Sequence, residues 1–220
     1  MNTYMRTSRI NELIDWLEGN PIGLSWTSPK TEVRPSLIPN AGNGRFAIED
    51  IGAGETVVLA GGIVLTVEEY NAVKSRWNFA TGVQIDPNHM LLQMGTDKYA
   101  ATINHTCKPN CYVSGQMCIK TLTNIKKDEE LSVDYGTIHD DDVLQFENCQ
   151  CGFVECRTYV TGKDWLSSDF QKANRFTLHL FEKIKGTNDQ AKLEQLKRLQ
   201  KIDLNKSELL KKEYEALIND

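Results

Sequence analysis

A chain of 220 residues is long enough to bury one good hydrophobic core, or one core with an appendage. Hydrophobic residues make up 40% and charged residues 25%, which is ordinary for a globular protein, and no apolar run approaches the roughly 20 residues of a membrane span. The net charge of −5 argues against nucleic acid as a direct ligand. The first ten residues lack an apolar signal core, so we expect an intracellular, cytoplasmic protein whose cysteines are metal ligands or buried thiols.

The first predicted element is a short amphipathic helix over residues 8–19. Ser8 is suited to begin it and Gly19 to end it, and its apolar residues recur at helical spacing. Four prolines between residues 21 and 39 then predict extended pieces and turns.

Short β-type runs with frequent glycine follow as far as about Tyr135. The predicted strands are Thr56–Ala60, Ile63–Thr66, Ala80–Ile85, Met90–Met94, Gln116–Leu122 and Leu131–Val133. Residues 66–74 predict a helix, with Thr66 as its cap and Glu69 at the capping-box position. The pattern favours a mainly β fold with helices (α+β), in which small sheets surround a core.

The character of the sequence changes after Trp165. Residues 170–185 predict a helix that stops at Gly186. Residues 189–219 are rich in Lys, Glu, Leu and Gln and predict one or two amphipathic helices, as in a hairpin broken near residues 203–205. We expect this helical tail to be available for a partner or for self-association.

Three cysteines, Cys149, Cys151 and Cys156, form a C-x-C-x4-C pattern. Zinc takes four ligands and binds thiolates well, so these three residues predict most of one structural metal site. The nearest sensible fourth donor is Cys107, in a turn-rich run over residues 104–110. The alternative is that some of these residues are ordinary buried thiols.

Four motifs carry a resemblance to one family. Residues 40–47 resemble its entry motif G-x-G-x-F-A, residues 104–110 its N-H-S-C-x-P-N, residues 128–136 its G-E-E-L-x-x-D-Y-G, and residues 149–157 its C-x-C-G-x-x-x-C-R. Together they resemble SET-domain protein-lysine methyltransferases with a post-SET zinc motif, and the ending Thr161–Trp165 is similar to that of small bacterial-type members. Asp128 and Thr158 stand where the family usually has glycine.

The resemblance implies a lead-in over residues 1–32, a SET domain over 33–146, a post-SET zinc motif over 147–166 and a helical region over 167–220. It implies S-adenosylmethionine as cofactor, a structural zinc ion, and a protein substrate with a basic, lysine-containing segment. Tyr135 would lie at the reacting centre, where its phenol orients the amine. The implied cofactor-binding residues are Gly42, Asn43, Gly44, Arg45, Asn104, His105, Tyr135 and Trp165, and the implied metal ligands are Cys107, Cys149, Cys151 and Cys156.

Each motif also has a structural interpretation. A lone G-x-G is often a hairpin turn, Asn104 and His105 can belong to a simple turn, and a tyrosine that ends a strand is often just buried. The sequence therefore leaves open a catalytically silent SET-like binding module, or a zinc-stabilised interaction domain, beside the enzyme. Tyr135 together with the cofactor loop favours the enzyme.

Overall fold

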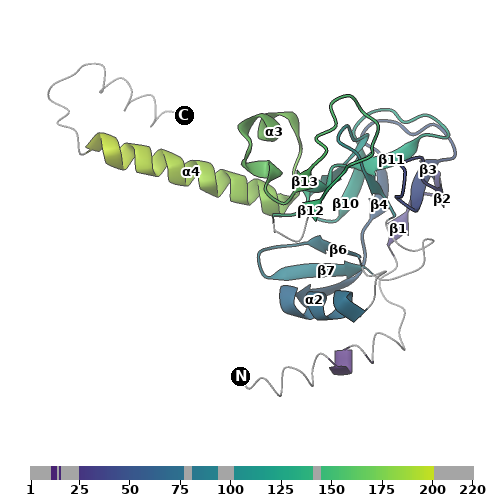
Figure 1. Ribbon diagram of the computed structural model, residues 1–220, viewed down its shortest axis with the longest axis horizontal. Coiled ribbons are helices and arrows are strands. Elements are labelled where there is room, and N and C mark those ends of the chain that lie inside the picture. The colour runs from purple at the N-terminus through teal and green to yellow at the C-terminus, as the bar shows by residue number, and fades with distance from the viewer. Residues whose placement is uncertain are drawn as a thin grey trace. The chain divides into compact units, whose positions relative to one another are not determined.

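The computed structural model describes residues 11–13, 15, 25–76, 81–93, 102–140 and 145–200. The chain divides into two units, residues 1–180 and residues 181–220. Among the described residues, the first unit holds all the strands, and the second holds most of the last helix (Figure 1). Among the residues that the structure describes, no helix is both long and apolar enough to cross a membrane.

Two four-stranded sheets build the centre of the first unit. The first has the order β1-β4-β10-β9, and every neighbouring pair is antiparallel. Its inward row includes Val58, Ile119 and Val113, which are paired across the strands and buried. Its strands are β1 (Trp26–Thr27), β4 (Thr56–Leu59), β10 (Cys118–Thr121) and β9 (Cys111–Ser114).

The second sheet has the order β2-β3-β11-β8 and positions the candidate site. Strands β3 and β11 are antiparallel, whereas β11 and β8 run parallel, with Ser132 opposite Asn104 and Val133 opposite His105. The parallel pairing brings Asn104 and His105 beside the strand that leads into Tyr135. Its strands are β2 (Thr31–Pro35), β3 (Asn43–Ala47), β11 (Glu130–Val133) and β8 (Asn104–His105).

A third, antiparallel sheet carries a helix on one face (Figure 1). Its order is β5 (Ile63–Thr66), β7 (His89–Gln93) and β6 (Thr81–Gln84), and α2 (Val67–Arg76) packs against it. The predicted capping box is confirmed, because the Glu69 amide donates to Thr66 Oγ1 and the Thr66 amide donates to the Glu69 carboxylate.

Two buried clusters support these sheets. The larger lies between the first two sheets and includes Val57, Ile125 and Leu131, all with no exposed surface. The smaller lies under α2 and includes Tyr70, Val73 and Leu92. The sheets therefore fold around a core, as the alternation of short β runs predicts.

The segment after β11 consists of short elements and one long helix. These are η1 (Tyr135–Thr137), β12 (Gln145–Phe146), β13 (Val160–Thr161), η2 (Asp164–Leu166), α3 (Ser168–Ala173) and α4 (Leu178–Gln200). The predicted helix over residues 170–185 is interrupted after residue 173, and its second part continues past the predicted end to residue 200. Asn174 is extended and ends α3, and the Thr177 amide donates to the Thr137 carbonyl, which starts a new helix. Gly186 lies inside α4, because a helical glycine costs only about 1 kcal/mol and does not end a helix by itself.

All six predicted strands coincide with observed ones, with boundary differences of one or two residues. The prediction omitted β2, β3 and β9, where prolines, glycines or polar residues interrupt the apolar pattern. Residues 11–13 and 15 are helical, and the rest of the helix predicted over 8–19 lies outside the described residues, as does everything predicted beyond residue 200.

Candidate active site and metal centre

Strand β11 is held in place by Asn110, the last residue of the Asn104–Asn110 motif. The Asn110 Nδ2 group donates to the Glu130 carbonyl at 2.8 Å, and its Oδ1 atom accepts the Ser132 N–H at 2.8 Å. One amide side chain thus satisfies two backbone groups on an edge of β11. The sequence predicted a turn here, and the structure shows what the turn fixes.

A pocket of about 430 Å³ opens beside the β8–β11 pair. This volume lies within the range of small-molecule and cofactor sites. Four segments of the chain line it: the loop between β2 and β3, strand β8, the start of η1, and the cysteine-rich region. The lining residues are Ile38, Pro39, Asn40, Ala41, Asn104, His105, Tyr135, Glu147, Asn148 and Gln150.

Asn104 is the polar centre of one wall of this pocket. Its Nδ2 group donates to Glu130 Oε1 at 2.9 Å, to the Asn43 carbonyl at 3.0 Å and to Ser36 Oγ at 3.1 Å. The Glu130 carboxylate also accepts the Ser36 hydroxyl at 2.7 Å and the Leu37 N–H at 2.9 Å. Glu130, to which the sequence assigned no role, therefore ties the loop before β3 to Asn104.

The predicted cofactor loop, residues 42–45, is not among the lining residues, although the Asn43 carbonyl contacts Asn104 in the pocket wall. Gly42 has a φ of +71°, and a Cβ atom at Gly44 would collide with the Glu130 carboxylate, so both positions favour glycine. Asn43 meets Asn104 through its carbonyl, and Arg45 is buried and donates to Thr31 Oγ1 at 3.1 Å. Trp165 is buried in η2 and is not among the lining residues. The cofactor roles of these five residues stay predictions.

Tyr135 lies at the start of η1 and lines the pocket beside His105, with ring centroids 5.4 Å apart. Its hydroxyl donates to the Ile103 carbonyl at 3.0 Å. Burial raises the pKa of Tyr135 to about 12, because the phenolate would be poorly solvated there. The phenol therefore stays protonated at physiological pH and acts as a hydrogen-bonding group rather than a base.

The four predicted ligand cysteines come together at one point. Their sulfur atoms lie within 4.8 Å of one another, with Cys107 Sγ 3.9 Å from Cys149 Sγ and 4.0 Å from Cys156 Sγ. A tetrahedral zinc site with Zn–S bonds of about 2.3 Å requires sulfurs about 3.8 Å apart, so the geometry fits. The backbone N–H of Arg157 points at Cys107 Sγ and that of Thr158 at Cys156 Sγ, each at 3.4 Å. Such donors stabilise metal-bound thiolates.

The electrostatics of the cluster call for a cation. Burial raises the pKa of the Cys107 thiol to about 11 and raises that of Cys149 further. Burial also opposes ionisation of Cys151, but hydrogen bonds from backbone N–H groups outweigh it and lower the pKa of that thiol to about 7. Four thiolates at this distance therefore need a metal ion to share their charge.

The comparisons with known proteins agree with this geometry. Residues 42–136 match the SET domain. They form a SET domain. The chain is also similar to three curated relatives. It is 32% identical over 131 residues to "Histone-lysine N-methyltransferase set-2" of Caenorhabditis elegans, an alignment that covers 54% of this chain and 8% of that protein.

The other two relatives are similar over the same share of the chain. They are "Histone-lysine N-methyltransferase ASHH2" of Arabidopsis thaliana, 26% identical over 140 residues (58% of this chain, 8% of the relative), and "Histone-lysine N-methyltransferase trithorax" of Drosophila melanogaster, 32% identical over 130 residues (54% and 3%). The chain thus spans less than a tenth of the length of these relatives.

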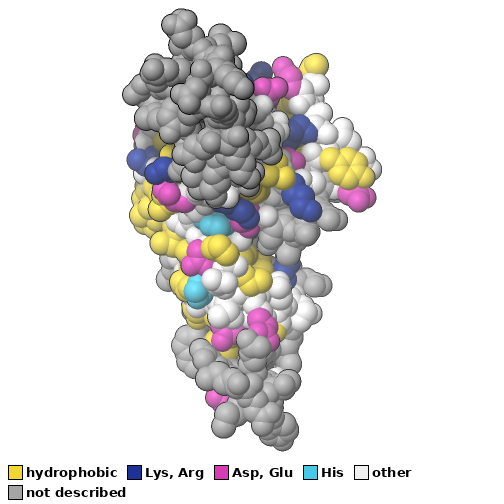
Figure 2. Space-filling model, turned by 90° about the vertical axis from the view of Figure 1, so that its left-hand side faces the viewer, with side chains coloured by type: hydrophobic (Ala, Val, Ile, Leu, Met, Phe, Trp, Pro, Cys, Tyr) yellow, Lys and Arg dark blue, Asp and Glu magenta, His cyan; other side chains and the backbone are white. Residues whose placement is uncertain are grey.

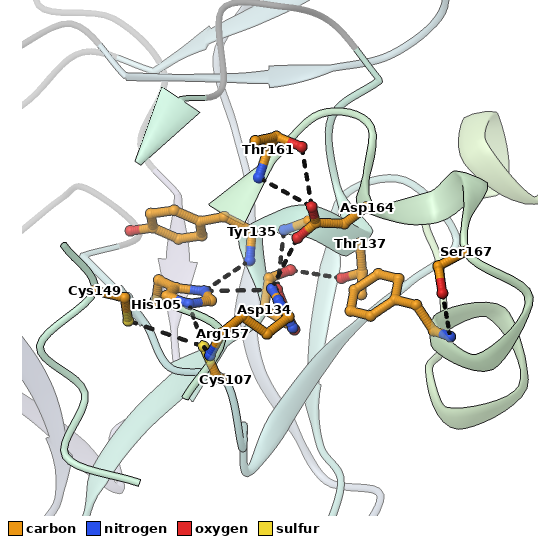
Figure 3. Close-up of polar contacts among 12 residues, drawn as sticks. His105, Cys107, Asp134, Tyr135, Thr137, Cys149, Arg157, Thr161, Asp164 and Ser167 are labelled. Carbon is orange, nitrogen blue, oxygen red and sulfur yellow. Dashed lines mark hydrogen bonds and ion pairs between the residues drawn. The ribbon is translucent and has the colours of Figure 1, made fainter. Parts of the chain in front are cut away.

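A buried ion pair joins the SET domain to the cysteine-rich region (Figure 3). The Arg157 guanidinium binds both oxygens of Asp134, at 2.6 and 2.7 Å, and lies 3.2 Å from Asp164 Oδ2. It also stacks over Phe170 at 4.7 Å. Burial opposes the charge of Arg157, but the contact with Asp134 outweighs it and raises the pKa of the guanidinium. The sequence contained both residues within motifs but gave no sign that they pair.

The His105 ring is buried between the pocket and the cysteine cluster. Burial lowers its pKa to about 4, against the opposing charge of Asp134, so the ring is neutral at physiological pH. Its Nδ1 atom accepts the Tyr135 N–H at 3.2 Å, and its Nε2 atom lies 3.4 Å from Cys107 Sγ. The resemblance implied that His105 binds the cofactor, and the structure adds contacts of its ring with Tyr135 and Cys107.

Proposed function

We propose that this chain transfers a methyl group from S-adenosylmethionine to a lysine side chain of a protein. The observation that carries the proposal is the convergence of Asn104, His105 and Tyr135 on one pocket of a SET domain. The printed names of the relatives, which are histone-lysine N-methyltransferases, support the same activity. The pocket has the volume and the mixed lining that a cofactor site needs.

When bound, the cofactor supplies an electrophilic methyl group on a sulfonium. The residues of the chain must align the acceptor amine and keep it neutral. A lysine of pKa about 10.4 is charged at pH 7, and exposing its neutral amine there costs about 4 to 5 kcal/mol. Burial around Tyr135 reduces that cost, because the same desolvation that raises the pKa of Tyr135 lowers that of an amine.

Tyr135 would orient the amine without taking its proton. Its hydroxyl is anchored on the Ile103 carbonyl, so the phenol oxygen has a defined position at the pocket wall. That oxygen keeps lone pairs that can accept from an amine or from a polarised C–H group. Alignment of this kind, rather than general-base chemistry, is the contribution we assign to Tyr135.

We propose that the substrate presents a basic, lysine-containing segment, and histones are the first proteins to test. The face of the molecule in Figure 2 carries acidic and basic side chains interspersed, with apolar side chains between them. The net charge of −5 is compatible with a basic partner and does not by itself select one.

The four-cysteine cluster is proposed to hold a structural zinc ion. Four sulfur ligands close the coordination sphere, so the ion would stabilise the fold and would not activate water. Metal analysis of protein purified without added metal should find one zinc ion per chain. Less than a tenth of an equivalent in folded protein would refute this assignment.

The activity is tested by two measurements on zinc-loaded protein. Calorimetric titration with S-adenosylmethionine should show saturable one-to-one binding, and labelled cofactor should transfer its methyl group to histones. The variant Tyr135→Phe should bind the cofactor and fail to transfer, while Tyr159→Phe, which changes an exposed tyrosine outside the pocket lining, should behave as wild type. Absence of cofactor binding by folded protein would favour the silent SET-like binding module instead.

A further inference from the structure

We propose that His105 and Arg157 are positioning residues that transmit the geometry of the cysteine cluster to Tyr135. Two hydrogen-bonded arms start at Cys107 and end on neighbouring backbone N–H groups at the start of η1, and they approach each other where His105 Nδ1 lies 3.6 Å from Asp134 Oδ1. Only the consequence for turnover rests on the proposed methyl transfer. The arms themselves are a property of the fold and can be tested without activity.

The first arm runs through the imidazole of His105, whose side chain is 1% exposed. Its Nδ1 atom accepts the backbone N–H of Tyr135 at 3.2 Å, so Nδ1 carries no proton. In the neutral ring the proton then lies on Nε2, which faces Cys107 Sγ at 3.4 Å. His105 therefore accepts from Tyr135 and donates to the sulfur (Figure 3).

The second arm runs through Arg157 and Asp134. The Arg157 backbone N–H donates to the same Cys107 sulfur at 3.4 Å, and its guanidinium binds both oxygens of Asp134. Asp134 Oδ1 in turn accepts the backbone N–H of Gly136 at 3.0 Å. The N–H groups of Tyr135 and Gly136 are thus both bound by side chains that are tied to Cys107.

A metal-bound thiolate is a stronger acceptor than a neutral thiol, because hydrogen bonds to ionised groups are roughly twice as strong. Metal binding at Cys107 therefore strengthens the first bond of each arm. The other end of Tyr135, its hydroxyl, is already anchored on Ile103. A misplacement of about 1 Å at a reacting centre can cost about 100-fold in rate, so arms that fix the backbone of Tyr135 matter for alignment.

Nuclear magnetic resonance on the full chain loaded with the NMR-active isotope of cadmium tests both arms directly. A hydrogen bond to a cadmium-bound sulfur transmits scalar coupling from the metal to the proton. We expect such coupling at the His105 Nε2 proton and at the Arg157 amide proton. Absence of the coupling at His105 would overturn the first arm, and absence at Arg157 would overturn the second.

Substitution at His105 tests the consequence for Tyr135. In His105→Gln one amide can still accept from Tyr135 and donate to Cys107, whereas His105→Leu fills a similar volume and can do neither. We expect His105→Leu to lower kcat by about 10- to 100-fold at saturating cofactor, in addition to any effect on cofactor Kd, and His105→Gln to recover most of that loss. Equal losses in the two variants, or a loss confined to cofactor Kd, would overturn the positioning role.

Arg157→Lys provides a second variant if His105→Leu does not fold. It keeps the charge and the backbone N–H but loses the two-pronged contact with Asp134. The Gly136 amide resonance should then shift more than that of Tyr135, because Asp134 accepts the Gly136 N–H directly. A larger shift at Tyr135 than at Gly136 would refute the assignment of the two arms. If wild-type protein transfers no methyl group, these spectra still decide the inference, and the proposed function alone fails.

Discussion

Removing the buried charge pair between Arg157 and Asp134 should destabilise the first unit severely. The substitution Arg157→Met keeps an unbranched side chain of similar length and the backbone N–H that points at Cys107. It removes both guanidinium contacts with Asp134, whose side chain is only 1% exposed. The carboxylate would then be left buried with its charge uncompensated.

The expected loss of stability follows from the burial of the ion pair. Breaking a buried ion pair by removing one partner costs about 3 to 5 kcal/mol. The Arg157 side chain is 26% exposed, so water can partly replace it, and we expect the lower end, about 3 kcal/mol. At about 2 to 4 °C per kcal/mol for a chain of this size, Tm should fall by about 6 to 12 °C.

The assay is thermal and urea unfolding of zinc-loaded protein, with metal content measured alongside. Lys126→Met is the matched control, because Lys126 lies 2.7 Å from Asp50 while both side chains are more than half exposed, and its Tm should not change measurably. In an Asp134→Asn background the Arg157→Met substitution should cost less than half as much. The reasoning is refuted if the cost is the same in both backgrounds, or if Arg157→Met behaves like the surface control.

Three further predictions concern strain, the phenol and the metal. Thr158→Gly should stabilise the protein by up to about 1 kcal/mol, because a β-branched residue at a φ of +64° is strained. Asp128→Gly, at a φ of +71°, should stabilise it less, because aspartate tolerates this region and Asp128 pairs with Arg34. Denaturant midpoints would show this order, and a loss of stability in both variants would contradict it. Between pH 10 and about 12 the wild type should lose stability that Tyr135→Phe retains, because the phenol binds its proton more tightly in the folded state than in the unfolded state. If the free energies of unfolding of the two proteins fall in parallel over this pH range, burial does not raise the pKa of Tyr135. Cys151→Ser should lose bound zinc and loosen residues 149–166, which metal analysis and limited proteolysis can measure, and full metal content would remove Cys151 from the ligand set.

The element types in the first 140 residues were largely predictable. Strands such as β4, β5 and β7 carry continuous apolar runs, and the α2 capping box is a local signal of four residues. Of the strands that were omitted, β2 contains a proline and β3 a glycine, and the two become extended by pairing with each other. The break between α3 and α4 was unpredictable for a similar reason, since the Thr137 carbonyl that binds Thr177 is distant in sequence.

The candidate site also has features that local sequence predicts and features that depend on contacts between distant residues. The spacing of Cys149, Cys151 and Cys156 is a local signal, and so are the two short motifs around Asn104 and Tyr135. The sequence by itself therefore determined which residues to consider for the site and which four cysteines to expect as metal ligands. The tertiary structure alone decided that Asn43 contacts Asn104 without lining the pocket, that Glu130 anchors Asn104, and that Arg157 pairs with Asp134. These contacts join residues far apart in the chain. Their energy depends on burial and on distances of a few ångströms, which arise only when the parallel pair of β8 and β11 has formed beside the cysteine cluster.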